Sequence, residues 1–149
     1  MNKRIAALAS SVVLAAGVLV GCGKSSKGMQ DGTFNAEFDK FDDHGWKGQV
    51  SITVADGKIT DAKFDYVNEE GALKSEDAEY QATMSSISGV GPAEFTKQYS
   101  EAIVEKQSAE VDVVTGATNS QADCKQLVEA ALEYANEGKT ETAVVSVSK

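Results

Sequence analysis

Hydrophobic and polar residues alternate along the first half of the chain. The segments 34–38, 50–54 and 62–66 each place an apolar side chain at every second position. This is the period of a β-strand with one buried face. We therefore predict three strands that share one apolar side.

The residues between the second and third of these segments predict a hairpin. Asp56-Gly57 is a dipeptide favoured in two-residue turns between antiparallel strands. Ile59 has the wrong parity for the apolar face of the returning strand. Because one extra residue would restore the parity, we expect a bulge or a strand-end shift near Thr60.

The second half of the chain changes to helical spacing. Tyr80, Met84 and Ile87 recur with that spacing over a short segment. Pro92 stands where the first residue of a further helix is favoured. The apolar stripe of that helix is Phe95, Tyr99, Ala102 and Ile103.

The clearest helical pattern is the last one. Its apolar residues follow the i, i+3, i+4, i+7, i+8 spacing: Cys124, Leu127, Val128, Ala131 and Leu132. Ser120 is a favourable N-cap, and Asp123 completes a box-like start. Gly138 follows the helix as a C-cap residue does.

The order of these elements predicts an α+β domain, with an antiparallel sheet and helices packed on one face. Residues 142–147 add a possible final strand. We expect a single domain over 31–149, with the aromatic residues named above in its core. A flexible tether of small polar residues, 22–30, precedes it.

The first 21 residues have the composition of an export signal. Lys3 and Arg4 precede an apolar stretch, Ile5–Val20, which is short for a membrane-spanning helix. The stretch ends in Leu-Val-Gly-Cys, which resembles a lipobox with Cys22 as the site of lipid attachment. An uncleaved anchor helix is the alternative. The first interpretation predicts a protein on the extracellular face of the cell membrane, held by acyl chains such as palmitate.

Charge and residue counts narrow the function further. The net charge is −9, and cleavage after Gly21 would make it −11 by removing Lys3 and Arg4. Such a domain is not expected to seek nucleic acid or anionic lipid by electrostatics. Two cysteines are present, and lipidation of Cys22 would leave Cys124 without an intramolecular partner.

Metal and acid–base sites have little support in the sequence. His44 is the one histidine, so a histidine-rich metal site is excluded. A Ser-His-Asp triad built on any histidine other than His44 is excluded as well. Residues 39–43 have the carboxylate density of a weak calcium loop but no ordered ligand spacing, and we interpret them as a solvated loop. Cys124 lies on an apolar stripe and is expected to be an inert buried thiol.

The segment richest in chemical information is 112–120, Asp-Val-Val-Thr-Gly-Ala-Thr-Asn-Ser. Its valines predict a strand-like stretch that runs into a turn of small residues and then into the last helix. A helix N-terminus offers unpaired N–H groups and about half a positive charge. A phosphate at Thr118 would lie within one turn of that charge.

This segment resembles the flavinylation motif of the FMN-binding domain family, in which Asp is followed by Thr or Ser and then by Gly-Ala-Thr. The matching residues are Asp112, Thr115, Gly116, Ala117 and Thr118. Residues 48–59 resemble the opening hairpin of that family, and 107–111 resemble its approach to the motif. A helix-entry turn in which Thr118 and Ser120 only cap is the alternative.

The resemblance implies FMN joined by its phosphate to the Thr118 hydroxyl. It also implies a separate flavin transferase that uses FAD and magnesium, to which Asp112 and Thr115 help present the site. Gly116 and Ala117 leave room for close approach. The redox chemistry would be that of the flavin ring, tuned by the protein.

Three other positions have two interpretations each. Trp46 is either an aromatic residue that stacks on the flavin ring or an aromatic residue of the core. His44 donates a hydrogen bond to reduced flavin or lies at the surface. Glu70, in the turn 68–71, belongs to an acidic turn near the flavin or to a solvated turn.

Together these features predict a membrane-anchored electron carrier rather than an autonomous enzyme. It would take electrons from a membrane quinol or NADH dehydrogenase and pass them to an extracellular acceptor, as in the surface flavolipoproteins of Gram-positive bacteria that it resembles. A cofactor-free, lipid-anchored binding or adhesion module is the alternative from another class. A subunit of an ion-pumping complex and a pheromone cut from the signal segment are further hypotheses.

Overall fold

A computed structural model describes residues 28–147. Three strands come first, then a short 3-10 helix, three α-helices and a last strand. In chain order they are β1 (Gly32–Phe38), β2 (Lys47–Ala55), β3 (Lys58–Val67), the 3-10 helix Lys74–Glu76, α1 (Ala78–Ser88), α2 (Pro92–Lys106), α3 (Thr118–Glu137) and β4 (Ala143–Val145). The signal segment 1–21, Cys22 and most of the tether 22–30 lie outside the described residues.

The four strands form one sheet in the order β3-β2-β1-β4. β1 and β3 pair with β2 in antiparallel fashion, as predicted, whereas β4 pairs with β1 in parallel, so the sheet is mixed rather than wholly antiparallel. The reason lies in where α3 ends. The Gln30 N–H donates to the Ala135 carbonyl (2.9 Å), so α3 ends beside the start of β1, and the chain leaves it in the direction of β1.

The hairpin and its bulge are confirmed. Asp56 and Gly57 both have positive φ, 52° and 73°, as a two-residue turn between twisted strands requires. Thr53 pairs with Asp61 and Val54 with Ile59, so Thr60 is the extra residue. The bulge turns Ile59 into the core, where it is 2% exposed.

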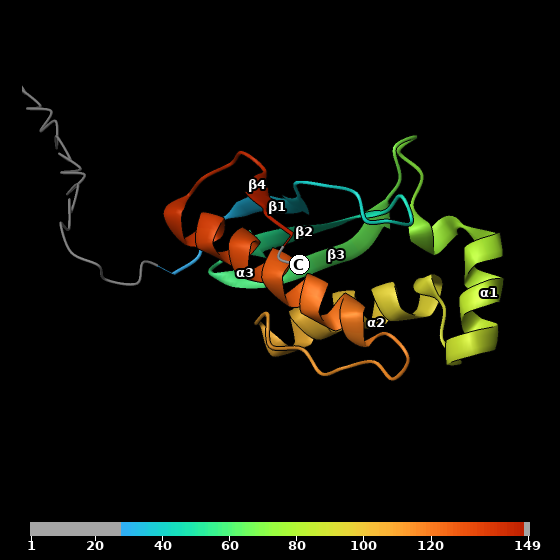
Figure 1. Cartoon of the computed structure of the whole chain (residues 1–149). Coiled ribbons are helices and arrows are strands. Elements are labelled where there is room, and N and C mark those ends of the chain that lie inside the picture. The colour runs from blue at the N-terminus through green and yellow to red at the C-terminus, as the bar shows by residue number, and fades with distance from the viewer. Residues whose placement is uncertain (1–27, 148–149) are drawn as a thin grey trace, which may run out of the picture.

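Helices α2 and α3 cover one face of the sheet, while α1 stands at one end of the molecule (Figure 1). α2 packs on β3, and α3 packs on β1 and β2. The alternating residues of the three long strands are buried beneath them, as predicted. The largest fully buried side chains include Phe34, Phe64, Phe95, Tyr99 and Leu127.

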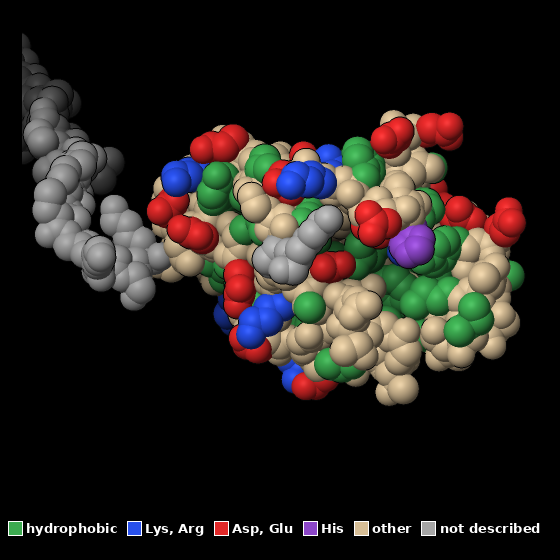
Figure 2. Space-filling view, viewed as in Figure 1, with side chains coloured by type: hydrophobic (Ala, Val, Ile, Leu, Met, Phe, Trp, Pro, Cys, Tyr) green, Lys and Arg blue, Asp and Glu red, His purple; other side chains and the backbone are tan. Residues whose placement is uncertain are grey.

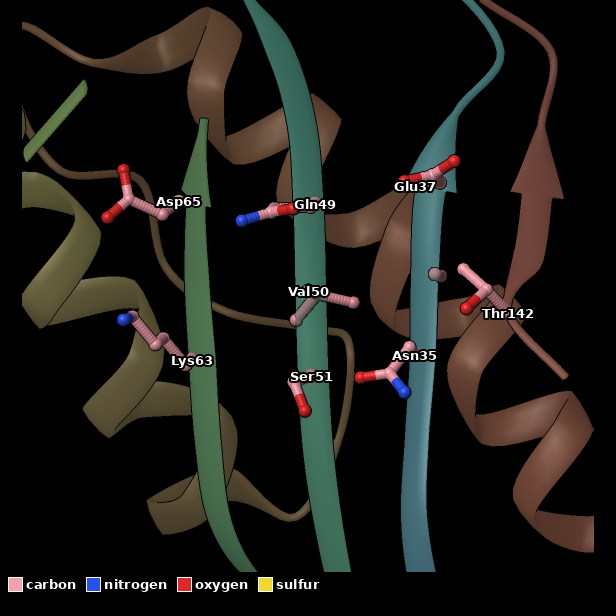
Figure 3. A pocket seen from close by; sticks show the side chains of 9 residues that line it. Asn35, Glu37, Gln49, Val50, Ser51, Lys63, Asp65 and Thr142 are labelled. Atoms are coloured by element: carbon pink, nitrogen blue, oxygen red, sulfur yellow. The ribbon is translucent and has the colours of Figure 1, made fainter. Parts of the chain in front are cut away.

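The opposite face of the sheet is polar. Figure 3 shows Asn35 and Glu37 of β1 beside Gln49 and Ser51 of β2, with α2 and α3 behind the strands. The register pairs Asn35 with Ser51 and Glu37 with Gln49. This face lacks the apolar residues that a second layer of helices would need, which explains why the helices gather on one side.

The predicted helices form, with one difference on α1. Pro92 is the first residue of α2, and Gly138 ends α3 in a left-handed conformation. Tyr80 and Met84 pack against the core, but Ile87 is 79% exposed because α1 extends past the sheet.

Cys124 lies inside the core, as its place on the apolar stripe predicts. Its side chain is fully buried, and burial raises the pKa of the thiol to about 12. A thiol at that pKa is almost wholly protonated at neutral pH. Separately, none of the helices within residues 28–147 is both long and apolar enough to cross a membrane.

Deletion of Thr60 is expected to destabilise the domain. Without the extra residue, the Ile59 side chain would move to the polar face of the sheet. The domain would then lose about 2–3 kcal/mol of the free energy of unfolding that burial of Ile59 provides. Thr60→Ala keeps the register and is the matched control. Urea denaturation of both variants measures the difference, and equal stabilities would show that the bulge does not set the register.

Candidate functional site

The segment between α2 and α3, residues 107–117, is an irregular loop and not the predicted strand-like stretch. It pairs with none of the strands, and side-chain hydrogen bonds hold it in place instead. Gln107 accepts from the Ile59 N–H and donates to the Ile59 carbonyl, both at 2.7 Å. The Gln121 amide donates to the Val111 carbonyl at 3.0 Å. The loop is thereby fixed to β3 at one end and to α3 at the other.

The Tyr99 hydroxyl fixes the turn that leads into α3. It donates to the Ala117 carbonyl (2.8 Å) and accepts from the Val114 N–H (3.0 Å). Tyr99 is fully buried on α2, and burial raises the pKa of its hydroxyl. It therefore remains protonated and can serve as donor and acceptor at once. The Ala117 N–H closes the same turn by donating to the Val114 carbonyl (2.9 Å).

Gly116 is required by the geometry of this turn. Its φ is +89°, and a Cβ atom there would come within 2.5 Å of the Ser88 carbonyl oxygen. The positive φ disfavours other residues, and the contact with backbone leaves no room for a side chain. The glycine of the motif thus allows the turn to lie against the end of α1.

Thr118 is the first residue of α3, and this corrects the predicted cap. Ala117, not Ser120, is the N-cap residue, and no side chain caps the helix. Ser120 lies inside the first turn and is nearly buried. Gln121 is the first residue to donate within the helix, to Ala117. Within the described chain no acceptor pairs with the N–H groups of residues 118–120, as expected at a helix N-terminus.

The start of α3 lines a cavity of about 420 Å³. The loop, α3, α1, α2, β3 and the 39–46 loop each contribute side chains. The lining residues are Asp42, His44, Tyr66, Lys74, Tyr80, Met84, Phe95, Gly116, Ala117, Thr118, Asn119, Ser120 and Asp123. In Figure 2 the histidine lies at a hollow in the surface, with hydrophobic side chains next to it.

The rim of the cavity at residues 42–46 is built on one aspartate. The Asp42 carboxylate accepts from the backbone N–H groups of His44 (2.8 Å) and Trp46 (2.9 Å). The Asp42 N–H donates in turn to the Trp46 carbonyl (2.7 Å). This compact turn brings the exposed His44 side chain to the cavity. The sequence had suggested a solvated loop over 39–43, with His44 either at the flavin or at the surface.

Tyr66 and Asp123 form a polar pair on the cavity wall. The Tyr66 hydroxyl donates to the Asp123 carboxylate at 2.7 Å. Burial raises the pKa of Tyr66, and the nearby Asp123 charge raises it further. Burial also raises the pKa of Asp123, with a smaller contribution from Asp42. The hydrogen bond from Tyr66 and the charge of Lys74 lower the pKa of Asp123, but burial is the stronger effect.

The cavity collects some of the residues singled out from the sequence and leaves others outside. Thr118, Gly116, Ala117 and His44 line it. Trp46 lies behind the wall, 7% exposed, with its ring edge-on to Tyr80 at 6.0 Å.

The remaining predicted residues lie elsewhere. Glu70 is exposed in the Asn68–Gly71 turn and is not among the lining residues. Asp112 and Thr115 line a separate groove between α2 and the loop. Asp112 is 88% exposed there and pairs with Lys106 at 2.9 Å.

Sequence analysis missed the role of three lining residues. Tyr66 and Phe95 were assigned to the core, which is correct for most of their surface but omits the edge that reaches the cavity. Lys74 was not singled out at all. Its only sequence signal is a lysine among acidic and small residues, Gly-Ala-Leu-Lys-Ser-Glu-Asp, and nothing local marks such a lysine as buried.

Comparison with known proteins identifies the domain. The family model of the FMN-binding domain matches residues 45–133, which include the loop, the start of α3 and all the cavity-lining residues except Asp42 and His44. The chain belongs to the FMN-binding domain family. This membership confirms the family to which the motif pointed.

Two known proteins are similar to this FMN-binding domain over most of the chain. The chain is similar to the 15 kDa lipoprotein of Treponema pallidum (strain Nichols), with 39% identity over 129 residues, 85% of this chain and 90% of that protein. Its fold is similar to the crystal structure of the CPE2226 protein from Clostridium perfringens. The TM-score is 0.78 at 47% identity, covering 80% of this chain and 99% of the other.

Tyr99→Phe is expected to destabilise the FMN-binding domain by about 1–3 kcal/mol, because it leaves the Val114 N–H without its acceptor and removes one of the two donors to the Ala117 carbonyl. Thermal denaturation measures the loss, and amide hydrogen exchange at Val114 should accelerate. Tyr134→Phe, a tyrosine of α3 for which the structure records no hydroxyl hydrogen bond, is the control. Unchanged exchange at Val114 would contradict this role of Tyr99.

Asp123→Asn is expected to change the pH dependence of stability. The folded-state pKa of Asp123 is raised, so its contribution to stability is fully present below about pH 4 and is lost as the pH rises through the folded-state pKa. Asparagine does not titrate. The stability of the variant relative to the parent should therefore increase from about pH 4 towards neutrality, as measured by urea denaturation. A difference independent of pH would refute the assignment.

Proposed function

We propose that this chain carries one FMN as a phosphoester on the Thr118 hydroxyl and acts as a membrane-anchored electron carrier. The observation that carries the proposal is the position of Thr118. It is the first residue of α3, and it lines a cavity at a helix start whose N–H groups have no acceptor among residues 28–147. A phosphate on Thr118 would lie beside those donors and the positive end of the helix.

The other lining residues fit a flavin. Tyr66, Tyr80, Met84 and Phe95 provide aromatic and apolar surface, which suits a flat ring system. Polar groups from Lys74, Asp123 and Asn119 lie among them. The cavity thus combines aromatic and apolar surface with polar groups that can fix the orientation of a ligand.

Attachment would need a separate flavin transferase. Among the described residues, no side chain is recorded in a hydrogen bond to the Thr118 hydroxyl, so none would activate it as a nucleophile. With FAD as donor, the threonine oxygen would bond to the FMN phosphorus, the pyrophosphate bond would break, and AMP would leave. The hydroxyl proton would go to a base of the transferase.

The groove beside the motif suits contact with that transferase. Asp112 and Thr115 lie on this groove and not on the cavity, so the groove and the cavity expose different parts of the motif. We assign the groove side to the transferase and the cavity side to the flavin. An enzyme could thus hold Asp112 and Thr115 while the Thr118 hydroxyl receives the phosphate.

Bound FMN would supply reversible two-electron chemistry. In the proposed route, electrons come from a membrane quinol or an NADH dehydrogenase and leave to an extracellular acceptor. The residues of the chain would hold the ring against the apolar wall and keep the covalent link at Thr118. A covalent link prevents loss of the cofactor by dilution outside the cell.

The proposed anchor is a lipid on Cys22 after removal of residues 1–21. Support comes from the Leu-Val-Gly-Cys sequence and from the relative named a lipoprotein. The chain reaches the domain at Gln30, which binds Ala135 near the end of α3. Thr118 lies 17 residues earlier on the same helix, roughly 25 Å away at 1.5 Å per residue. The flavin would therefore be presented at the end far from the tether.

Thr118→Val is expected to abolish flavinylation. Valine keeps the shape of the side chain but has no oxygen to bond to phosphorus. Co-expression with the transferase should give the parent chain a mass gain of one FMN less one water and a fluorescent band after denaturation. The valine variant should show neither signal and should keep the parent's circular dichroism.

Thr118→Ser is the matched control, because it restores the hydroxyl at the same backbone position. Its mass gain should return at least in part. A valine variant that still gains the FMN mass would overturn the assignment of Thr118. A parent protein without the mass gain, purified from its native envelope, would overturn the covalent cofactor itself.

A further inference from the structure

Lys74 is a buried cation in the candidate flavin cavity. Its residue is 7% exposed, and it lines the cavity with the start of α3. Its Nζ lies 4.3 Å from the centre of the Tyr80 ring, 4.6 Å from that of Tyr66 and 5.7 Å from that of Trp46. Three aromatic rings thus lie at cation–π distance from one ammonium group.

The ammonium group has no anionic partner in the described part of the chain. No carboxylate lies within 4.0 Å of Lys74 Nζ, whereas five other lysines have such a partner. No hydrogen bond from Lys74 Nζ to residues 28–147 is recorded, yet no fully buried side-chain nitrogen or oxygen there lacks a partner. The Nζ atom therefore keeps some accessible surface, and Lys74 is one of the residues that line the cavity.

The backbone holds Lys74 firmly in this position. The Asp65 carboxylate accepts from the Ser75 N–H (3.2 Å) and from the Ser75 hydroxyl (2.5 Å). Val67 and Leu73 form an isolated bridge that closes the turn before Lys74. Lys74 thus begins a 3-10 helix that these contacts attach to β3, and this attachment fixes its backbone position.

A buried cation with donors only and no protein acceptor indicates an anionic or electron-rich ligand. The nearest titratable groups are Tyr66, which stays protonated, and Asp123, whose pKa is raised by burial. Asp42 faces the same space from the 39–46 loop, and His44 lies beside it. Among the titratable residues that line the cavity, Lys74 is the one lysine, and its residue is only 7% exposed.

We propose that Lys74 is the residue that raises the reduction potential of the flavin, by compensating the negative charge that the ring gains on reduction. The inference rests on the proposed function. Two electrons, from a quinol or in vitro from dithionite, and one proton from solvent leave the reduced ring with one negative charge. A fixed ammonium beside the ring stabilises that charge and leaves the oxidised, neutral ring almost unaffected.

The test compares reduction potentials of flavinylated variants. Lys74→Met removes the charge while keeping an unbranched apolar chain, and Lys74→Arg keeps the charge. The methionine variant should lower the equilibrium constant for reduction at least tenfold, a shift of about 30 mV for a two-electron couple. The Lys74→Arg variant should have a reduction potential closer to that of the parent than to that of Lys74→Met. Lys74→Gln replaces the methionine variant if that variant does not fold.

Lys139→Met is the matched control, because Lys139 lies 5.0 Å from the Tyr134 ring but outside the cavity. Its potential should equal that of the parent. The pH at which the reduced ring takes up a second proton gives an independent measure, and it should be higher in Lys74→Met than in the parent. Equal potentials and equal protonation in the parent and Lys74→Met would overturn the proposal.

A second arm works without covalent attachment. Unmodified protein is titrated with free FMN, oxidised and then reduced by dithionite. The parent should prefer the reduced form, and Lys74→Met should lose that preference by a comparable factor. A parent chain that gains no FMN mass but shows this preference would refute the phosphoester and support Lys74. A parent that binds neither form and gains no mass would overturn both proposals.

Discussion

The Tyr99 hydroxyl is the group on which the geometry of the site depends. It joins the Val114 N–H to the Ala117 carbonyl and so fixes the turn from which α3 starts. Tyr99 belongs to α2, which packs on β3, and Gln107 ties the loop to the same strand at Ile59. These contacts to α2 and β3 therefore fix the position of Thr118 relative to the sheet, although the loop that carries the motif has no regular structure.

The cavity brings together groups that favour an anion in a chain whose net charge is −9. An acidic surface repels phosphate, so local positive potential must come from elsewhere. The start of α3 supplies backbone N–H groups, and Lys74 supplies a full charge at a different point of the same cavity. A ligand with a phosphate at one end and a redox ring at the other matches this pairing, which is why the family membership and the geometry support the same cofactor class.

α3 also relates the site to the proposed anchor. Its C-terminal end contacts Gln30, where the described chain enters the domain, and its N-terminal end carries Thr118. The length of α3 thus separates Thr118 from the point where the chain enters the domain. The groove that contains Asp112 and Thr115 shares no lining residue with the cavity. Attachment of a cofactor and its use in electron transfer would then engage different surfaces.

The sequence by itself determined the strands, the hairpin with its bulge at Thr60, the helices and, through the motif, the family. These features depend on local periods, turn chemistry and short-range spacing, which are legible along the chain. Only the tertiary structure decided that α3 begins at Thr118 and not after Ser120, because the Ala117 carbonyl is held by a tyrosine 18 residues away. It also decided that β4 pairs in parallel and that Lys74 meets Thr118 in one cavity. Residues 74 and 118 come together only through the packing of β3, α2 and α3, and no local pattern records contacts made at that separation.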